Sequence, residues 1–111
     1  MKKRYCFALD LKDDAQLIEE YKEHHKVGRP DVIERIKQDG IEVMDLYITG
    51  NRLFMIMEVN ETFSFEKKAA SDAALPEVRE WEEFMWSYQQ ALPWAKPGEK
   101  WVLMEKMFSL K

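Results

Sequence analysis

Two apolar segments separated by a three-residue turn constrain the fold of this chain more than any other feature. Residues 41–48 (IEVMDLYI) and 52–59 (RLFMIMEV) are rich in aliphatic and aromatic side chains, and residues 49–51 (TGN) lie between them. Apolar runs of this length, joined by a short turn that contains glycine, are typical of a β-hairpin. The other elements of the chain have to fit around this predicted antiparallel pair.

A further strand is predicted at residues 4–11, near the start of the sequence. One face carries Tyr5, Phe7, Leu9 and Leu11, and the other carries the mostly smaller Cys6, Ala8 and Asp10. Because side chains alternate between the faces of a strand, this pattern predicts at least one deeply buried face. A first helix is expected from about Asp14 to His24. Asp13 is its expected N-cap, with Gln16 at the spacing of a capping box.

Proline and glycine mark the boundaries of a second helical segment. Residues 26–29 form a connector, Pro30 suits the first turn of a helix, and Gly40 suits the position just after its end. The apolar side of this segment consists of Val32, Ile33 and Ile36. These positions predict a short amphipathic helix leading into the hairpin.

The last third of the chain is predicted to contain two helices and a strand. A helix from Thr62 to Ser71, capped by Thr62 or Ser64, is followed by the longest helix, from Pro76 to about Ala91. The apolar face of that longest helix is made of Val78, Trp81, Met85 and Tyr88, with Phe84 alongside. Residues 93–100, with two prolines and a glycine, form a loop, and residues 101–108 (WVLMEKMF) form the final strand.

The order of these elements predicts the fold class. A βαββαβ plan with extra helical turns is the ferredoxin-like arrangement, an α+β fold in which helices cover one face of a four-stranded antiparallel sheet. Residues 1–111 are expected to form one domain, since this length is near the commonest domain size. Both faces of the strands are apolar, so an uncovered face would be a large hydrophobic patch. A homodimer that packs sheet against sheet, as in a dimeric α+β barrel, would cover it, and a long loop such as 92–100 is the alternative.

Composition excludes several classes of function. The net charge is −4 and acidic and basic residues are interspersed, so no basic stripe invites nucleic acid. No apolar run is long enough to span a bilayer, and Asp10 and Asp13 interrupt any signal-peptide core. The single cysteine, Cys6, allows no internal disulfide and fits a reducing compartment, so we expect a cytoplasmic protein. A buried, inert thiol is the favoured interpretation of Cys6.

His25 is the first candidate for chemistry. Leu17, Tyr21 and His25 are four residues apart, so they stack on one face of the first helix. A histidine titrates near neutrality and can act as acid or base, although a histidine at a helix C-terminus also simply caps it. His24 points about 100° away from this face and is expected to be exposed. No cluster of His or Cys residues completes a metal site, so no metal is expected.

Other polar and aromatic side chains have both structural and functional interpretations. Tyr21 is either a hydrogen-bond donor to a ligand or a core tyrosine with its hydroxyl at the rim. Trp81 is either an aromatic platform or core, and Glu82 beside it is most simply a solvated carboxylate. Asp45 and Tyr47 share a strand face and hint at a cleft or a sheet edge, whereas Met44 and Met55 fit a core or an interface.

Taken together, the motifs resemble those of the L-rhamnose mutarotase family over almost the whole chain. They are E-Y-x-x-x-H at Glu20, Tyr21 and His25, then Pro30-Asp31 and Gly40, L-Y-I at 46–48, N-x-L-F at 51–54, W-x-x-F-M at 81–85 and the closing MEKMFSL. In this order and at these spacings the pieces are fairly specific. The resemblance implies a ferredoxin-like homodimer that interconverts the α and β anomers of a 6-deoxy sugar without a cofactor.

The resemblance also implies roles for individual residues. His25 matches the acid–base histidine, and Tyr21 matches a substrate-binding tyrosine. The paired tryptophans of the family fall on Trp81 and Glu82, and a further substrate-contacting tyrosine falls on Met44, with Tyr47 retained nearby. Arg29 stands where the family commonly has a tryptophan. These departures fall on the expected sugar pocket, so L-fucose is an alternative to L-rhamnose as substrate.

Mutarotation needs few catalytic groups, and this chain offers few. One proton leaves the anomeric hydroxyl and one reaches the ring oxygen, and a single histidine can serve as acid or base. Two other functions stay open from the residues alone. One is a cofactor-free oxygenase of the dimeric ferredoxin-like type, whose substrate pocket the Met- and Trp-rich interior would suit. The other is a non-enzymatic ligand-binding or dimerisation module, in which His25 would contribute at most to stability.

Overall fold

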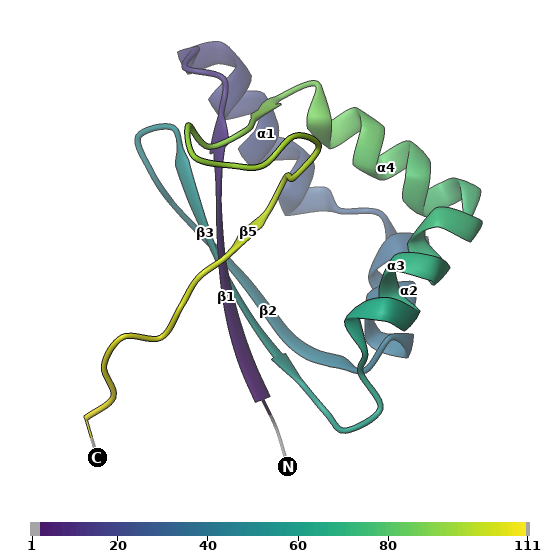
Figure 1. Ribbon diagram of the computed structural model, residues 1–111. Coiled ribbons are helices and arrows are strands. Elements are labelled where there is room, and N and C mark those ends of the chain that lie inside the picture. The colour runs from purple at the N-terminus through teal and green to yellow at the C-terminus, as the bar shows by residue number, and fades with distance from the viewer. Residues whose placement is uncertain (1–2, 111) are drawn as a thin grey trace.

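The structure, a computed structural model, describes residues 3–110 and is built from one antiparallel sheet with helices on one side (Figure 1). The long strands are β1 (Lys3–Leu11), β2 (Ile41–Thr49) and β3 (Arg52–Val59), and the short ones are β4 (Gln89–Gln90) and β5 (Val102–Leu103). The helices are α1 (Ala15–Val27), α2 (Pro30–Gln38), α3 (Phe65–Ala74) and α4 (Pro76–Trp86). The strand order β2-β3-β1-β4, with β5 also on β1, confirms the predicted ferredoxin-like α+β fold.

The predicted hairpin forms one side of the sheet, with β2 at the edge. β2 and β3 pair from Thr49 opposite Arg52 to Ile41 opposite Val59, with one irregularity between Ile41 and Val43. Gly50 has φ of 57°, a left-handed backbone conformation that glycine adopts without steric cost, which explains the glycine in this tight turn. The hairpin thus begins and ends within one residue of the predicted segments.

The first helix begins and ends later than predicted. Asp14, and not Asp13, is the N-cap, because its side chain accepts hydrogen bonds from the backbone N–H groups of Gln16 (3.0 Å) and Leu17 (3.1 Å). The helix continues through Val27 and ends at Gly28, whose φ of 68° stops it. The predicted end at His24 was three residues early, so His25 lies inside the last helical turn.

Gly40 lies in the turn between α2 and β2 and packs against the residues that follow β3. Its φ is 94°, and a Cβ atom there would lie 2.7 Å from both the Asn60 side-chain oxygen and the Thr62 hydroxyl. The Gly40 carbonyl accepts a hydrogen bond from Asn60 N–H at 2.9 Å. Only glycine fits this crowded turn, which holds α2 against the sheet.

The C-terminal third departs most from the predictions. The helix expected from Thr62 to Ser71 runs from Phe65 to Ala74 with Ser64 as its cap, and the helix expected to reach Ala91 ends at Trp86. Gln89–Gln90 instead forms β4, because the edge of β1 at Asp10 and Leu11 offers hydrogen-bonding groups that this segment pairs with. Tertiary pairing here overrides the helical pattern of the sequence.

The final strand is much shorter than the predicted span 101–108. Val102 and Leu103 pair with Ala8 and Phe7, and the Met104 N–H donates to the Cys6 carbonyl at 2.7 Å. Beyond that bond the chain leaves β1 and extends away from the sheet (Figure 1). The rest of this apolar segment therefore pairs with no strand among residues 3–110.

Two clusters of buried side chains lie between the sheet and the helices. One consists of Phe7, Ile41, Met55, Met57 and Val59, and the other of Leu11, Tyr21, Leu53, Met85 and Tyr88. Trp101, on the segment leading into β5, packs against both. Within residues 3–110, no helix is long and apolar enough to cross a membrane.

Candidate active site

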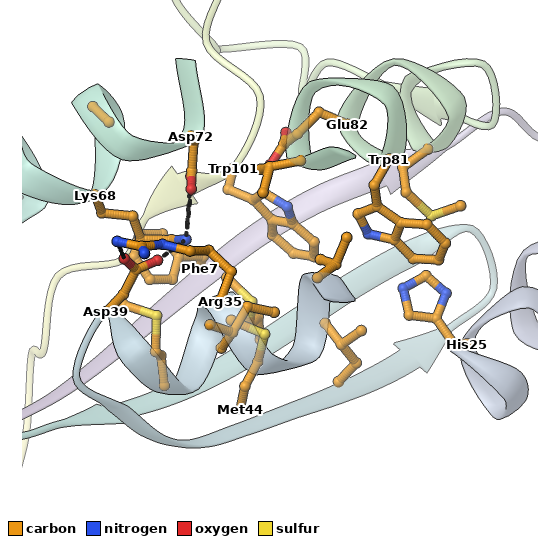
Figure 2. Close-up of a pocket in the computed structure, with 18 of the residues that line it drawn as sticks. Phe7, His25, Arg35, Asp39, Met44, Lys68, Asp72, Trp81, Glu82 and Trp101 are labelled. Carbon is orange, nitrogen blue, oxygen red and sulfur yellow. Dashed lines mark hydrogen bonds and ion pairs between the residues drawn. The ribbon is translucent and has the colours of Figure 1, made fainter. Parts of the chain in front are cut away.

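A pocket of about 340 Å³ lies between the sheet and the helices (Figure 2). Every strand except β5 contributes to it, as do all four helices and Trp101. Its floor is apolar and includes Phe7, Met44, Leu46, Met55 and Met57. Its polar lining consists of Tyr21, His25, Arg35, Asp39, Lys68, Asp72, Glu82 and Gln89. A concave, mostly apolar site with a few polar groups is typical of a small-molecule pocket.

His25 enters this pocket from the last turn of α1. Its Nδ1 donates to the backbone carbonyl of Tyr21 at 3.0 Å, and its ring lies 4.4 Å from the Tyr21 ring and 5.6 Å from the Trp81 ring, centre to centre. With Nδ1 committed to a carbonyl, the neutral ring keeps the lone pair on Nε2. Burial lowers the pKa of His25, which the bond to the Tyr21 carbonyl partly opposes. Near neutral pH the imidazole is therefore a free base.

Tyr21 is buried beside His25 with its hydroxyl bonded to Gln89. The Gln89 side-chain N–H donates to the Tyr21 hydroxyl oxygen at 3.1 Å, and both residues are almost completely buried. Burial raises the pKa of Tyr21 to about 12, so the phenol stays protonated. Since its oxygen already accepts from Gln89, its own O–H is left to donate elsewhere. Gln89 was not predicted from the sequence, where it stands beside Gln90 in the last turn of the expected helix.

The prediction that His24 is exposed is wrong. It is half-buried, and its Nε2 lies 3.2 Å from the Tyr88 hydroxyl, which donates to the Glu20 carboxylate at 3.1 Å. Its ring also contacts Phe84, with ring centres 4.6 Å apart. Because Glu20 and His24 flank Tyr21 along α1, this network fixes the position of the helix that carries the two pocket residues.

Trp81, Glu82 and Met44 also line the pocket. Trp81 and Glu82 come from α4 and Met44 from β2, and Figure 2 shows Trp81 beside His25 at one end. Partial burial raises the pKa of Glu82, while Lys100, 3.8 Å from the carboxylate, acts in the opposite direction. Glu82 therefore interacts with the pocket and is more than the solvated carboxylate favoured from the sequence.

Tyr47 and Arg29 do not line the pocket of this chain. Met44 and Leu46 face the helices, so Asp45 and Tyr47 lie on the opposite face of the sheet, where Tyr47 is 57% exposed. Arg29 pairs with Asp31 at 2.8 Å and lies 3.7 Å from Glu80. Contact of either residue with a substrate is a prediction that the geometry of a single chain does not support.

Four charged residues at the other end of the pocket were not predicted from the sequence as pocket residues. Arg35 of α2, its C-cap residue Asp39, and Lys68 and Asp72 of α3 lie together there (Figure 2). In the sequence they look like ordinary surface charges of amphipathic helices, and only the fold brings Lys68 of α3 to Asp39 at the end of α2. No group of three or more His, Cys, Asp or Glu residues suited to a metal ion exists among residues 3–110.

The fold and the pocket define a small α+β protein with a mostly apolar pocket that contains a few polar groups beside a neutral histidine. Residues 4–110 match the L-rhamnose mutarotase family. The chain therefore belongs to that family and is a sugar mutarotase, an isomerase.

Individual relatives agree with this assignment. The chain is 41% identical over 109 residues to an L-fucose mutarotase of Xanthomonas campestris pv. campestris, which covers 96% of this chain and 87% of that protein. It is 35% identical over 115 residues to a UPF0734 protein of Dictyostelium discoideum, covering 97% and 90% of the two chains.

Solved structures show the same fold. An L-rhamnose mutarotase from Formosa agariphila superposes with a TM-score of 0.72 at 21% identity, covering 98% of this chain and 99% of that one. A type-II polyketide cyclase of Streptomyces glaucescens superposes with a TM-score of 0.63 at 16% identity, covering 98% and 97%. The fold thus occurs in proteins with different reactions, so the reaction has to be argued from the site.

Proposed function

We propose that this chain interconverts the α and β anomers of a 6-deoxy sugar, L-fucose or L-rhamnose, with His25 as the catalytic acid–base. The observation that carries the proposal is the hydrogen bond from His25 Nδ1 to the Tyr21 carbonyl, within a pocket of monosaccharide scale. That bond leaves Nε2 as the acceptor for a proton. The lowered pKa keeps this nitrogen unprotonated near neutrality.

The proposed reaction opens and recloses the sugar ring. Nε2 of His25 takes the proton of the anomeric hydroxyl, the bond from the anomeric carbon to the ring oxygen breaks, and a carbonyl forms at the anomeric carbon. The ring oxygen receives a proton, and the imidazolium that has just formed is the nearest acid to supply it, directly or through a water. Rotation of the open-chain aldehyde followed by the reverse steps gives the other anomer, with no net change in protons.

Tyr21 and Trp81 are proposed to position the sugar. The Tyr21 hydroxyl accepts from Gln89, so it can donate to a sugar oxygen, and its raised pKa keeps that hydrogen in place. The Trp81 ring beside His25 offers an apolar surface to a sugar face or to the methyl group of a 6-deoxy sugar. Met44 and Glu82 line the same pocket and are proposed as further substrate contacts.

The name of the family and the name of one relative both support a 6-deoxy sugar as the substrate. One relative is an L-fucose mutarotase, and the family is that of L-rhamnose mutarotases. Where the family pattern has a second tryptophan and a further tyrosine, this chain has Glu82 and Met44, so its pocket offers a carboxylate and a thioether instead. We propose L-fucose as the sugar to test first, because 41% identity over most of both chains supports it.

We also propose that residues 1–111 act as one cytoplasmic mutarotase domain that forms a homodimer through the free face of the sheet. That face carries Cys6, Ala8, Val43, Tyr47, Phe54 and Ile56, and no helix covers it (Figure 1). Beyond β5, the side chains of Met107, Phe108 and Leu110 are 74–92% exposed. An apolar sheet face with an apolar extension beside it is the kind of surface that a second copy covers.

Saturation-transfer proton NMR tests the proposed activity. One anomeric proton of L-fucose, and then of L-rhamnose, is irradiated with the wild-type protein and with His25→Ala. We expect the wild type to accelerate exchange between the anomers and the variant to leave it at the uncatalysed rate. Equal acceleration by both proteins would remove His25 from the mechanism, and no acceleration by the wild type with either sugar would refute a 6-deoxy sugar mutarotase.

A further inference from the structure

The pocket has a second polar end that the proposed mechanism does not use. Arg35, Asp39, Lys68 and Asp72, which we call the charged cluster, lie away from His25 and Trp81 with the apolar side chains of the floor between (Figure 2). Lys68 Nζ bridges Asp39 at 3.2 Å and Asp72 at 3.1 Å, and Arg35 Nη2 lies 3.2 Å from Asp39. The cluster therefore joins α2 to α3 at one wall of the pocket.

The charged cluster contains donors and acceptors whose hydrogen bonds are not all satisfied. The Nε of Arg35 is buried without a partner, and Asp72 accepts from Lys68 alone among the described residues although a carboxylate offers about four lone-pair sites. The Asp72 side chain is only 22% exposed, and this burial raises the pKa of its carboxyl despite the adjacent ammonium. Charged groups that are half-buried and incompletely bonded cost stability, which is a reason to look for a ligand that completes them.

The charge balance indicates what kind of ligand fits. The cluster holds two cations and two anions, so it offers no net attraction to a phosphate, a carboxylate or an amine. A sugar hydroxyl is both a donor and an acceptor, and adjacent hydroxyls can bond to an ammonium or guanidinium and a carboxylate at once. Neutral polyols are thus the ligand class that matches both halves of the cluster.

The size of the pocket leaves room for such contacts. At about 30 Å³ per water molecule, its 340 Å³ holds the equivalent of roughly eleven waters. A 6-deoxyhexose has eleven non-hydrogen atoms, but covalent bonds hold them at about half the separation of hydrogen-bonded waters, so the sugar fills only part of this volume. Space therefore extends from a sugar at His25 toward the charged cluster.

We propose that Arg35, Asp39, Lys68 and Asp72 form a second subsite of the same pocket, which binds ring hydroxyls of a neutral sugar remote from the anomeric carbon. This inference rests on the proposed function for the position of the anomeric carbon at His25. The hydroxyls come either from the far side of the reacting sugar or from a second sugar linked to it. The subsite then determines which 6-deoxy sugars the protein selects, and His25 performs the same chemistry on each.

Binding measurements test the subsite independently of turnover. Quenching of tryptophan fluorescence, reported by Trp81 and Trp101 in the pocket, gives the dissociation constants of L-fucose and of a disaccharide with galactose linked to reducing-end L-fucose. The variants are Asp72→Asn, which keeps the shape of the side chain, and Lys68→Met. Glu23→Gln is the control, because it breaks the exposed pair of Glu23 with Lys26, at 2.9 Å, outside the pocket. Circular dichroism and melting curves establish that each variant is folded.

The proposal predicts that both cluster variants weaken sugar binding on the order of ten- to hundred-fold, as expected for the loss of hydrogen bonds to charged groups, while the control does not. Weaker binding of L-fucose itself identifies its own remote hydroxyls as the ligand. Weaker binding of the disaccharide alone identifies the second sugar. Unchanged binding of both sugars by folded variants would overturn the subsite and leave the charged cluster as a link between helices.

The anomer-exchange rate of the same proteins separates the two proposals. If the wild type binds sugars in a cluster-dependent way but does not accelerate exchange, the proposed function fails and the subsite stands. If the cluster variants keep both wild-type binding and wild-type exchange, the proposed function stands and the subsite fails.

Discussion

His25 occupies a position where two demands on a histidine meet. It lies in the last turn of α1, where a cation is favoured, yet burial among aromatic rings lowers its pKa. Its bond to the Tyr21 carbonyl sets the tautomer of the imidazole ring. Because α1 continues to Val27, the Tyr21 carbonyl is not one of the free carbonyls that a C-cap satisfies. The hydrogen bond therefore supports the catalytic interpretation of His25 and not the capping one.

Replacement of His25 with Asn is expected to abolish the acceleration of anomer exchange and to change stability little, because a half-buried polar side chain is replaced by another. His24→Asn is the matched control, since His24 is its neighbour on α1 but lies outside the pocket. Exchange rates and melting temperatures measured on both variants decide the point. A His25→Asn protein that is active would contradict the catalytic role, and one that is unfolded would contradict the expected small effect on stability.

The pH dependence of the reaction follows from the direction of the His25 pKa shift. Because the base form is required and burial lowers its pKa below the reference value of 6.5, kcat/KM is expected to fall on acidification with a midpoint below 6.5. The unfolded chain binds this proton more readily, so stability also declines as pH falls below about 6.5. A pH profile between 5 and 8 measures the midpoint, and a value at or above 6.5 would argue against a buried neutral base.

Tyr21→Phe removes a hydroxyl that has a role in both function and stability. The Gln89 amide would lose its acceptor in a buried position, which costs about 1–3 kcal/mol of folding free energy. The lost donor is expected to lower kcat/KM about tenfold, as for one hydrogen bond to substrate. Denaturant unfolding and exchange kinetics measure the two effects. Full activity in the variant would show that the phenol does not contact the sugar.

At the scale of single elements, the two aspartates before α1 give a direct test of capping. Asp14 accepts from two backbone N–H groups of the first turn, whereas Asp13 makes no side-chain hydrogen bond among those found in the structure. Asp14→Ala is expected to cost about 1 kcal/mol, and Asp13→Ala less than about 0.5 kcal/mol. Urea unfolding of both variants compares them, and equal losses would mean that the cap is shared.

Elements defined by local signals were predictable, and elements defined by long-range pairing were not. The hairpin and the starts of α2 and α4 follow from a turn glycine and from Pro30 and Pro76, which act within a few residues. The end of α4 depends on β1, because Gln89 and Gln90 pair with residues some eighty positions earlier. A helical pattern in the sequence does not show whether these two residues continue α4 or pair with β1.

At the scale of the whole molecule, the uncovered sheet face and the extended C-terminal segment call for a partner. We expect analytical ultracentrifugation to give a mass close to twice the 13.3 kDa of the chain. Ile56→Lys, in the middle strand of the free face, is expected to shift the protein toward monomer, since it would bury an unpaired charge between the copies. A wild-type monomer at micromolar concentration would refute the dimer.

Patterns along the chain predict the fold class, the hairpin, the helix that carries Tyr21 and His25, and the resemblance to the mutarotase family. These rest on patterns local to each element, namely periodicity, caps and turn residues, and on motifs read in order. Only the tertiary structure brought Gln89 to Tyr21, Tyr88 to Glu20 and His24, and the charged cluster to the far end of the pocket. Such contacts join residues up to 68 positions apart, so they depend on how elements pack and have no signature along the chain.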